Sequence, residues 1–344
     1  FFAGNSPRHC AAERKAKAVQ EPTVKSADRG TRTLTAEKMT ANFNQRTQDV
    51  ERFDAVGGAK FAELDRQGTA GQIAFTQTDE VVRLRGGEPT VWDLAARVKA
   101  SEIDWDTRNE KSFLRGKVST TYFSQRQTGG AAPFGDANAP VFVTSNQAEF
   151  DHRAEVGVYS GNARAWQENN YVRAERLVFQ QKSKRMDGEG KVQSLLYDAR
   201  RKENGREVSR PVFAAADRIA YSDENRQLRY EGSVDIRQGT DRIVSGVTDV
   251  FLDENNEVKQ TIAQNNVVIT QPKRRAAGDF AQYLAADETV VLRGNPASVE
   301  DAEQGSSRGG QLTVFMRENR VEGQGATRQN GAGRIRTIYK VKPQ

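Results

Sequence analysis

Residues able to carry catalysis or bind a metal are few in this sequence. The chain has two histidines, His9 and His152, and one cysteine, Cys10. A zinc site built from cysteine and histidine needs about four such ligands, so this kind of site is essentially excluded. A single cysteine also excludes an internal disulfide. His152 lies between Asp151 and Arg153 in a polar stretch, and we expect it at the surface.

Other catalytic arrangements are equally weak. Residues 157–161 contain Tyr-Ser-Gly but lack the Gly-x-Ser-x-Gly elbow and the strand-to-helix context of a serine hydrolase. Paired carboxylates such as Asp253 and Glu254 fall in expected turn tips, and no glycine-rich phosphate loop precedes a helical pattern. We therefore predict that the protein is not an enzyme and has no catalytic residue, metal ion or cofactor.

The chemistry that the sequence supports is noncovalent, because apolar residues recur at fixed spacing from a glycine anchor. Five of the eight intervals between anchors are 29 or 30 residues, and the three longer ones are interpreted as insertions. Fixed periods of this size indicate a stacked repeat protein. The anchors are Gly57, Gly86, Gly116, Gly161, Gly190, Gly232, Asn265, Gly294 and Gly323.

Two further positions, counted back from each anchor, carry the same type of residue in most repeats and support the periodicity. A small residue lies sixteen positions before eight of the nine anchors, as Ala174 and Ala216 do. An aromatic residue lies eleven positions before six of the nine, where chance would place fewer than one in a chain with 8% aromatic residues. The aromatic residues are Phe75, Trp105, Phe150, Phe179, Tyr221 and Tyr283.

Within each repeat the apolar period is two, which is typical of strands with one covered face. Leu228, Tyr230 and Val234 alternate with polar residues, and a polar turn at 222–226 precedes them. Each repeat is therefore predicted to be a strand, a turn and a second strand, giving about nine such units. One exception is Ala11–Val19, whose basic, alanine-rich sequence favours a short helix or a flexible lead-in.

Composition agrees with a narrow stacked interior. Only 36% of the 344 residues are hydrophobic, and no stretch reaches the roughly 20 apolar residues of a membrane helix. The net charge is +6, but basic residues alternate with acidic ones, and the densest basic clusters, 182–185 and 273–275, fall in turns. We expect solvated strand faces and no nucleic-acid partner.

These repeats resemble the OstA-like repeat of the lipopolysaccharide transport proteins LptA, LptC and the N-terminal part of LptD. The clearest matches are 174–179, 216–221 and Gly161-Asn162-Ala163, and a further one runs from 245 to 269. The resemblance is good from about Val141 to Ile269, fair to Gly323, and weaker from Leu34 to Phe123.

The resemblance implies an elongated, twisted β-jelly roll that is open along one side. It also implies a function: the apolar groove binds the acyl chains of lipopolysaccharide and passes the lipid across the periplasm toward the outer membrane. The implied partners are other jelly-roll proteins of the Lpt bridge and the inner-membrane ABC transporter complex, and end-to-end homo-oligomers are a further expectation.

The chain is about twice the length of one such domain, which suggests a fusion or a long LptA-like protein. Residues 1–32 are predicted as a lead-in, 33–127 as an LptC-like jelly-roll segment, 128–140 as a Gly/Pro/Ala linker and 141–344 as an LptA-like segment. The start at Phe1 is compatible with the end of an inner-membrane anchor or leader, or with an ordinary start.

The residues expected to line the lipid-binding interior come from the apolar faces of the predicted strands. For each aromatic member, the alternative is that it only fills the core. For the whole protein, the alternatives are a structural or adhesive β-solenoid without a ligand and, more remotely, a polysaccharide-active solenoid enzyme. The expected lining residues are Phe75, Ile103, Trp105, Phe150, Leu177, Phe179, Val192, Ile219, Tyr221, Leu228, Tyr230, Val234, Ile236 and Tyr283.

Overall fold

The protein is described here by a computed structural model. All regular secondary structure in its described residues is β-strand, which confirms the predicted all-β fold. In these residues no helix is long and apolar enough to cross a membrane. The described residues are 7–21, 30–123, 139–197, 199–203, 206–254, 257–324 and 335–339.

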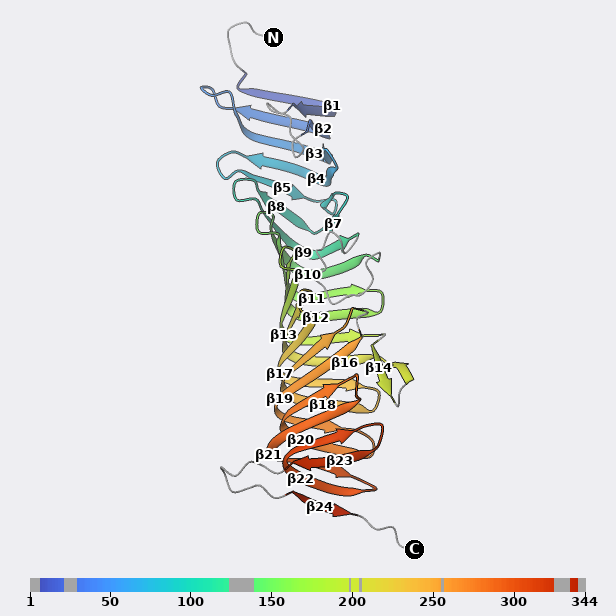
Figure 1. The fold of residues 1–344 in the computed structure, drawn as a ribbon. Coiled ribbons are helices and arrows are strands. Elements are labelled where there is room, and N and C mark those ends of the chain that lie inside the picture. The colour runs from blue at the N-terminus through green and yellow to red at the C-terminus, as the bar shows by residue number, and fades with distance from the viewer. Residues whose placement is uncertain are drawn as a thin grey trace. The chain divides into compact units, whose positions relative to one another are not determined.

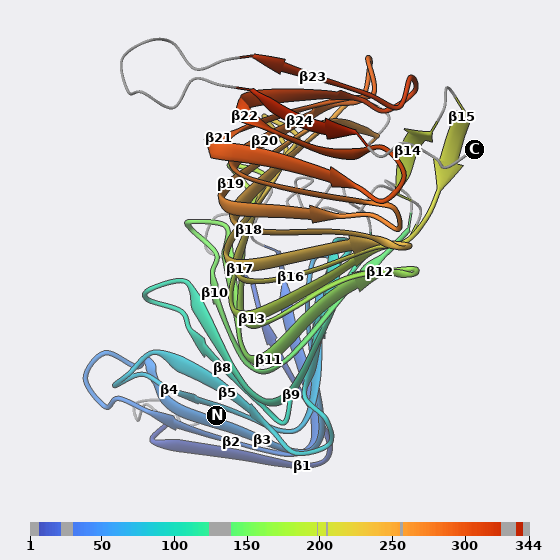
Figure 2. The same ribbon diagram turned by 90° about the horizontal axis from the view of Figure 1, so that it is seen from below.

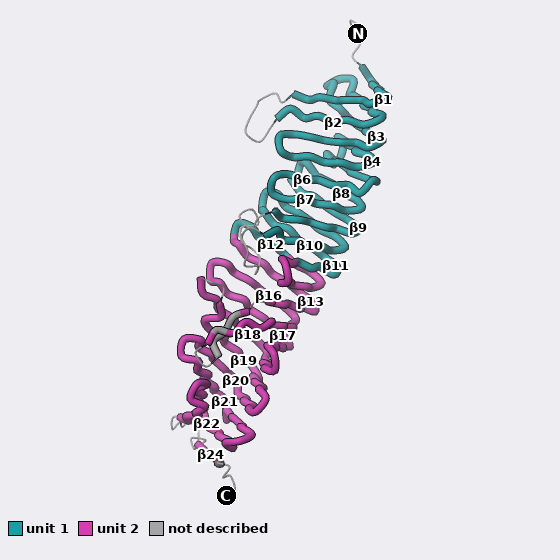
Figure 3. Tube along the Cα trace, turned by 90° about the vertical axis from the view of Figure 1, so that its right-hand side faces the viewer, with its two compact units in different colours: residues 1–129, 136–165, 178–182 teal, residues 130–135, 166–177, 183–344 magenta. Residues whose placement is uncertain are grey.

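The chain divides into two compact units, which Figure 3 shows in different colours. Unit 1 contains residues 1–129, 136–165 and 178–182, and unit 2 contains the rest. Strands β11 (Val156–Gln167) and β12 (Asn170–Gln180) contribute to both. The other strands of unit 1 are β1 (His9–Gln20), β2 (Arg32–Phe43), β3 (Val50–Glu63), β4 (Arg66–Thr76), β5 (Val81–Arg85), β6 (Thr90–Trp92), β7 (Ala96–Lys99), β8 (Glu102–Asp106), β9 (Lys111–Tyr122) and β10 (Val141–Asp151).

Unit 1 is built from antiparallel neighbours along the chain (Figure 1). β1 pairs with β2, β2 with β3, and β3 with β4. The next two strand positions are each divided into halves: β5 and β6 both pair with β4, while β8 and β7 both pair with β9. β9 then pairs with β10, so the strands that flank the predicted linker are direct neighbours.

Unit 2 repeats the same antiparallel pattern. β13 pairs with β16, each strand from β16 to β21 pairs with the next, and β22 pairs with both β23 and β24. β14 and β15 form a separate hairpin that projects from the other strands of the unit (Figures 1 and 2). The strands are β13 (Arg185–Leu196), β14 (Arg200–Glu203), β15 (Arg206–Ser209), β16 (Val212–Ser222), β17 (Gln227–Gln238), β18 (Asp241–Leu252), β19 (Val258–Thr270), β20 (Arg274–Leu284), β21 (Thr289–Asp301), β22 (Gly305–Phe315), β23 (Arg320–Gln324) and β24 (Arg336–Tyr339).

The repeating glycine anchor marks a β-bulge near the middle of the long strands. At most anchors two consecutive residues have positive φ, and the strand register shifts there. Glycine tolerates this left-handed conformation, and asparagine is the next most tolerant residue. Such bulges bend a strand, and Figure 2 shows the long strands of each unit bending. The pairs are Gly57-Gly58, Gly86-Gly87, Gly116-Lys117, Gly161-Asn162, Gly190-Lys191, Gly232-Ser233 and Asn265-Asn266.

A side chain from the neighbouring strand covers several of these glycines. A Cβ atom on Gly232 would lie 2.9 Å from Asp217 Cβ, and one on Gly161 would lie 2.8 Å from Asn146 Nδ2. Glycine is therefore needed there both for its φ and for the space above it. The anchors Gly294 and Gly323 do not have positive φ in the described chain, so their conformation departs from the other anchors.

Three local expectations can now be compared with the fold. The helix or flexible lead-in expected at Ala11–Val19 is wrong, because these residues belong to strand β1 and pair with β2. The polar turn expected at 222–226 is confirmed between β16 and β17. Most of the expected linker, residues 128–138, lies outside the described residues, and the division into LptC-like and LptA-like segments stays a prediction.

The bulge can be tested with Gly232→Ala. We expect this variant to lose about 2–4 kcal/mol of unfolding free energy, because the new Cβ adds left-handed strain to a clash with Asp217. The matched control is Gly58→Ala, which also has positive φ but nothing within 4 Å of the added Cβ. It should lose only about 1–2 kcal/mol. Equal losses in urea unfolding would contradict the packing part of this argument.

Candidate lipid-binding interior

Strand pairing converts the aromatic column of the sequence into a row that crosses neighbouring strands. In unit 1 Phe75 lies opposite Phe53 on one side and Val82 on the other. Val82 in turn faces Trp105, and the row continues through Ser112 to Phe150. These side chains share one sheet face because directly paired residues point to the same side. We call this set the aromatic row of unit 1: Phe53, Phe75, Val82, Trp105, Ser112 and Phe150.

A second row lies beside it on the same face, two residues nearer the bulges. All of its members are buried, with exposed fractions between 0 and 6%. The aromatic row, in contrast, is half-buried throughout. The buried row therefore closes the core, while the aromatic row keeps apolar surface accessible. The buried row of unit 1 consists of Ala55, Ile73, Leu84, Ile103, Leu114 and Ala148.

Aromatic rings continue this packing into the following strands of unit 1. The rings of Phe150 and Tyr159 meet edge to face with centroids 5.6 Å apart, and Tyr159 meets Phe179 in the same way at 5.7 Å. The Tyr159 hydroxyl lies 2.8 Å from the Tyr122 hydroxyl, and both phenols are buried. Burial raises the pKa of Tyr122 to about 12 and that of Tyr159 well above its ordinary value.

Unit 2 has the same two rows but a different composition. The row equivalent to the aromatic one runs through Met186, Tyr221, Leu228, Val250, Thr261, Tyr283, Val290 and Val314. Its first three members and Val314 are buried, whereas the four from Val250 to Val290 are half-buried. The second row is Ile219, Tyr230, Thr248, Ala263, Ala281, Leu292 and Leu312, and all of its members are buried.

The strand halves beyond the bulges contribute a further inward-facing set in unit 2. Ile236 pairs with Ile243, which pairs with Ile269, and all three are half-buried. Val192 and Val234, which lie closer to the bulges, are fully buried. The interior of unit 2 therefore has half-buried apolar side chains on both sides of its bulges.

Two local features of unit 2 fix the buried side chains. Gly188 leaves room for its neighbours, since an added Cβ would lie 2.7 Å from Ile219 Cγ2 and 3.0 Å from Leu177 Cδ2. The Tyr230 hydroxyl lies 2.9 Å from Ser194 Oγ, so this buried phenol has a polar partner. Buried polar groups without a partner are costly, which explains why a serine lies here.

The structure thus places the fourteen sequence-predicted residues in two classes. Nine are buried: Ile103, Leu177, Phe179, Val192, Ile219, Tyr221, Leu228, Tyr230 and Val234. Five are half-buried: Phe75, Trp105, Phe150, Ile236 and Tyr283. Their part in lipid binding stays a prediction.

Sequence reasoning missed Phe53 and Val82 on the aromatic row, and it also missed the inward-facing Tyr159 and Ile243. Phe53 and Val82 do not occupy the aromatic column, because they lie on the second strand of a hairpin. These residues could have been predicted from the antiparallel register, because each predicted turn determines which residues of the two strands lie opposite one another.

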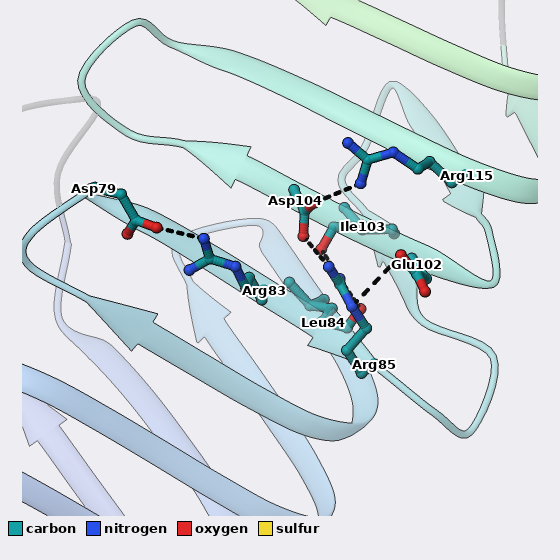
Figure 4. A network of polar contacts seen from close by, with 8 residues as sticks. All are labelled: Asp79, Arg83, Leu84, Arg85, Glu102, Ile103, Asp104 and Arg115. Atoms are coloured by element: carbon teal, nitrogen blue, oxygen red, sulfur yellow. Dashed lines mark hydrogen bonds and ion pairs between the residues drawn. The ribbon is translucent and has the colours of Figure 1, made fainter.

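The opposite sheet face is polar and is held by ion pairs. In unit 1, Asp104 binds Arg85 and lies 2.7 Å from Arg115 Nη1, while Asp79 binds Arg83 (Figure 4). Arg85 also donates to the Ile103 carbonyl at 3.0 Å. These contacts come from side chains that alternate with the apolar rows. The sheet therefore has one apolar face and one charged face. The apolar face can bury hydrocarbon, whereas the charged face remains in water.

His152 has the surface position that the sequence predicts. It is exposed in a turn, and its Nε2 lies 2.8 Å from Ser112 Oγ. In the described part of the chain, no group of three or more histidine, cysteine or acidic residues could hold a metal ion.

We compared the chain with protein-family models, curated proteins and solved structures. A family model described as LptA/(LptD N-terminal domain) LPS transport protein matches residues 11–111, 142–229 and 214–320, which together exceed half of the chain. Among solved structures, the chain is similar to LptH from Pseudomonas aeruginosa, described as the LptA homologous periplasmic component of the conserved lipopolysaccharide transport device. That similarity has 19% identity and a TM-score of 0.34, and it covers 39% of this chain and 96% of the other. The search of curated proteins gives no match.

The buried phenol pair predicts a loss of stability at alkaline pH. Above pH 10 the unfolded chain ionises Tyr122 and Tyr159, whereas the folded chain keeps both protonated because burial raises each pKa. The native state then binds more protons, so the unfolding free energy falls by about 1.4 kcal/mol per pH unit for each tyrosine. In denaturant unfolding between pH 10 and 12, the double variant Tyr122→Phe/Tyr159→Phe should show a shallower fall. An unchanged slope would contradict the assignment.

Proposed function

Since the chain belongs to the LptA/(LptD N-terminal domain) family of LPS transport proteins, we propose that it binds lipopolysaccharide through its acyl chains and passes it across the periplasm toward the outer membrane. The observation that carries this proposal is the half-buried apolar row beside a fully buried one. A filled core explains the buried row. The half-buried row offers apolar surface that an acyl chain can cover.

The energetics of such a row suit transfer better than storage. Burying hydrocarbon contributes about 0.8 kcal/mol per methylene, so several acyl chains bind without any specific polar contact. Neighbouring strands lie about 4.8 Å apart, and every member of the aromatic row except Ser112 is apolar. A lipid that advances along the row would therefore exchange most of its contacts for similar ones. A lipid that moves along the row therefore does not have to escape from a deep energy minimum. The energy that drives its movement is proposed to come from the ABC transporter complex.

The proposed location is the periplasm, and the proposed partners are other jelly-roll proteins of the Lpt bridge and the inner-membrane ABC transporter complex. Edge strands support this assembly. β1 pairs with β2 on one side, and in the described residues no strand pairs with its other side. Exposed strand edges provide unpaired backbone groups that accept a strand from another chain.

Photo-crosslinking tests the proposed lipid path. A photoreactive residue in place of Phe150 or Tyr283, which are half-buried on the inward rows, should form a lipopolysaccharide adduct in cells. The matched controls are Glu149 and Gln282. Each precedes its test residue on the same strand and therefore points to the opposite face. We expect adducts from the first pair and few or none from the second, as read on lipopolysaccharide blots.

A specific observation also favours the alternative function, a structural solenoid without ligand. Nine of the fourteen predicted lining residues are buried, as in a filled core. The crosslinking experiment separates the two functions, because a folded protein without adducts at Phe150 and Tyr283 would support the solenoid and overturn lipid carriage.

The free edge of β1 predicts association between copies. Static light scattering across a wide concentration range should show a mass that rises with concentration, because each added copy can extend the sheet. A constant monomer mass, together with no binding to the periplasmic domains of the transporter complex, would contradict the proposed assembly.

A further inference from the structure

An apolar and basic patch lies on the outer face of unit 2, away from the inward rows. Phe213 and Tyr197 are 51% and 47% exposed, and Leu195 lies directly opposite Phe213 on the neighbouring strand. Phe213 points outward because the adjacent Ala214 is buried on the inner face. Large exposed aromatic side chains that gather in one place usually mark an interaction site.

Arginines extend this patch along the strand ladder. Phe213 pairs with Arg237 and Arg237 with Arg242, and the ladder then passes through Thr270 to Arg275. The side chains of Arg237 and Arg242 are 58% and 49% exposed. We call the set Leu195, Tyr197, Phe213, Arg237, Arg242 and Arg275 the outer patch.

One carboxylate, Asp235, binds two arginines of the outer patch, and it does not balance their combined charge. Asp235 binds Arg237 at 2.7 Å and Arg242 at 2.9 Å, and both arginines hold its pKa at about 2. These bonds use the Nε and one Nη of each guanidinium, and a guanidinium has five N–H donors. The next acidic residue on the ladder is Glu300, which faces Arg275 and lies 3.6 Å from Arg308.

The outer patch borders an insertion that the repeat does not need. The anchors Gly190 and Gly232 are 42 residues apart instead of 29, and the extra length forms the β14–β15 hairpin. β13 and β16 still pair directly up to Leu196 and Val212, so the hairpin leaves the sheet without interrupting it. By sequence, the segment 200–210 contains five basic and two acidic residues.

We propose that the outer patch docks unit 2 on an anionic phospholipid bilayer surface. Basic residues are attracted to anionic headgroups, and aromatic side chains favour the interface between headgroups and hydrocarbon. A standard protein interface needs about 20–30 residues on each side, whereas the outer patch has three apolar side chains and three arginines. This chemistry fits a lipid surface better than a protein partner, and it is independent of lipid binding in the interior.

Vesicle sedimentation of the full chain tests the proposal. The protein should bind vesicles of mixed phosphatidylcholine and phosphatidylglycerol, bind weakly to pure phosphatidylcholine, and dissociate as salt rises. The double variant Phe213→Ser/Arg275→Gln should partition on the order of tenfold less. The matched control is Phe123→Ser/Arg46→Gln, which changes the same residue types at exposed positions of unit 1.

Each outcome decides the proposal. Loss of binding in the patch variant alone, with circular dichroism and unfolding unchanged, supports it. Absent binding, equal binding to neutral vesicles, or equal losses in both variants overturns it. A concentration-dependent mass that only the patch variant lowers, without vesicle binding, would instead assign the outer patch to a second copy and also overturns it. Crosslinking at Phe150 and Tyr283 should persist in the patch variant, so failure here is distinguishable from failure of the proposed function.

Discussion

The structure depends on one backbone constraint: a pair of left-handed residues placed at the same position in every second strand. Side chains alternate between the two faces of a strand, so an extra residue in one strand alone would turn every later side chain to the wrong face. Equivalent bulges occur at Gly190-Lys191, Gly232-Ser233 and Asn265-Asn266. At each of them, the register with the paired strand shifts. Both halves of each strand therefore keep their apolar side chains inward. The bulge bends the strands and preserves the rows at the same time.

This constraint explains how a chain with 36% hydrophobic residues can form an apolar interior in each unit. Each strand needs only a few inward side chains, and many of those in the buried rows are small, such as Ala55, Ala263 and Ala281. The outward positions are then available for charge. Their ion pairs are mostly solvent-exposed and contribute little individually, about 0–1 kcal/mol each. Stability rests on the repeated inward packing, and the charged face keeps the other side of the sheet in water.

Much of the fold was predictable from the sequence, because the same pattern of residues recurs in each repeat. The glycine anchors predicted the repeat, the polar clusters predicted the turns, and period two predicted the strands. That the anchors form β-bulges was not predicted. The failures have physical causes. Ala11–Val19 has good helix formers, but pairing with β2 outweighs their weak intrinsic preference. Burial was also unpredictable: Ile103 and Trp105 look equivalent by alternation, yet only the first is buried, and Phe179 is buried although it occupies the same column as Trp105.

The difference between the two rows also constrains what the interior can do. A carrier must hold a lipid and then release it, so a site of very high affinity would defeat transfer. Under the proposed function, residues such as Phe75, Trp105 and Phe150 would offer partial apolar contact at every second strand, and the buried row behind them would keep an acyl chain from sinking deeper. The proposed affinity is then spread over many weak contacts. No single side chain of the row is then essential to the proposed function. What the proposed function requires is that the bulges keep the inward side chains of neighbouring strands in line.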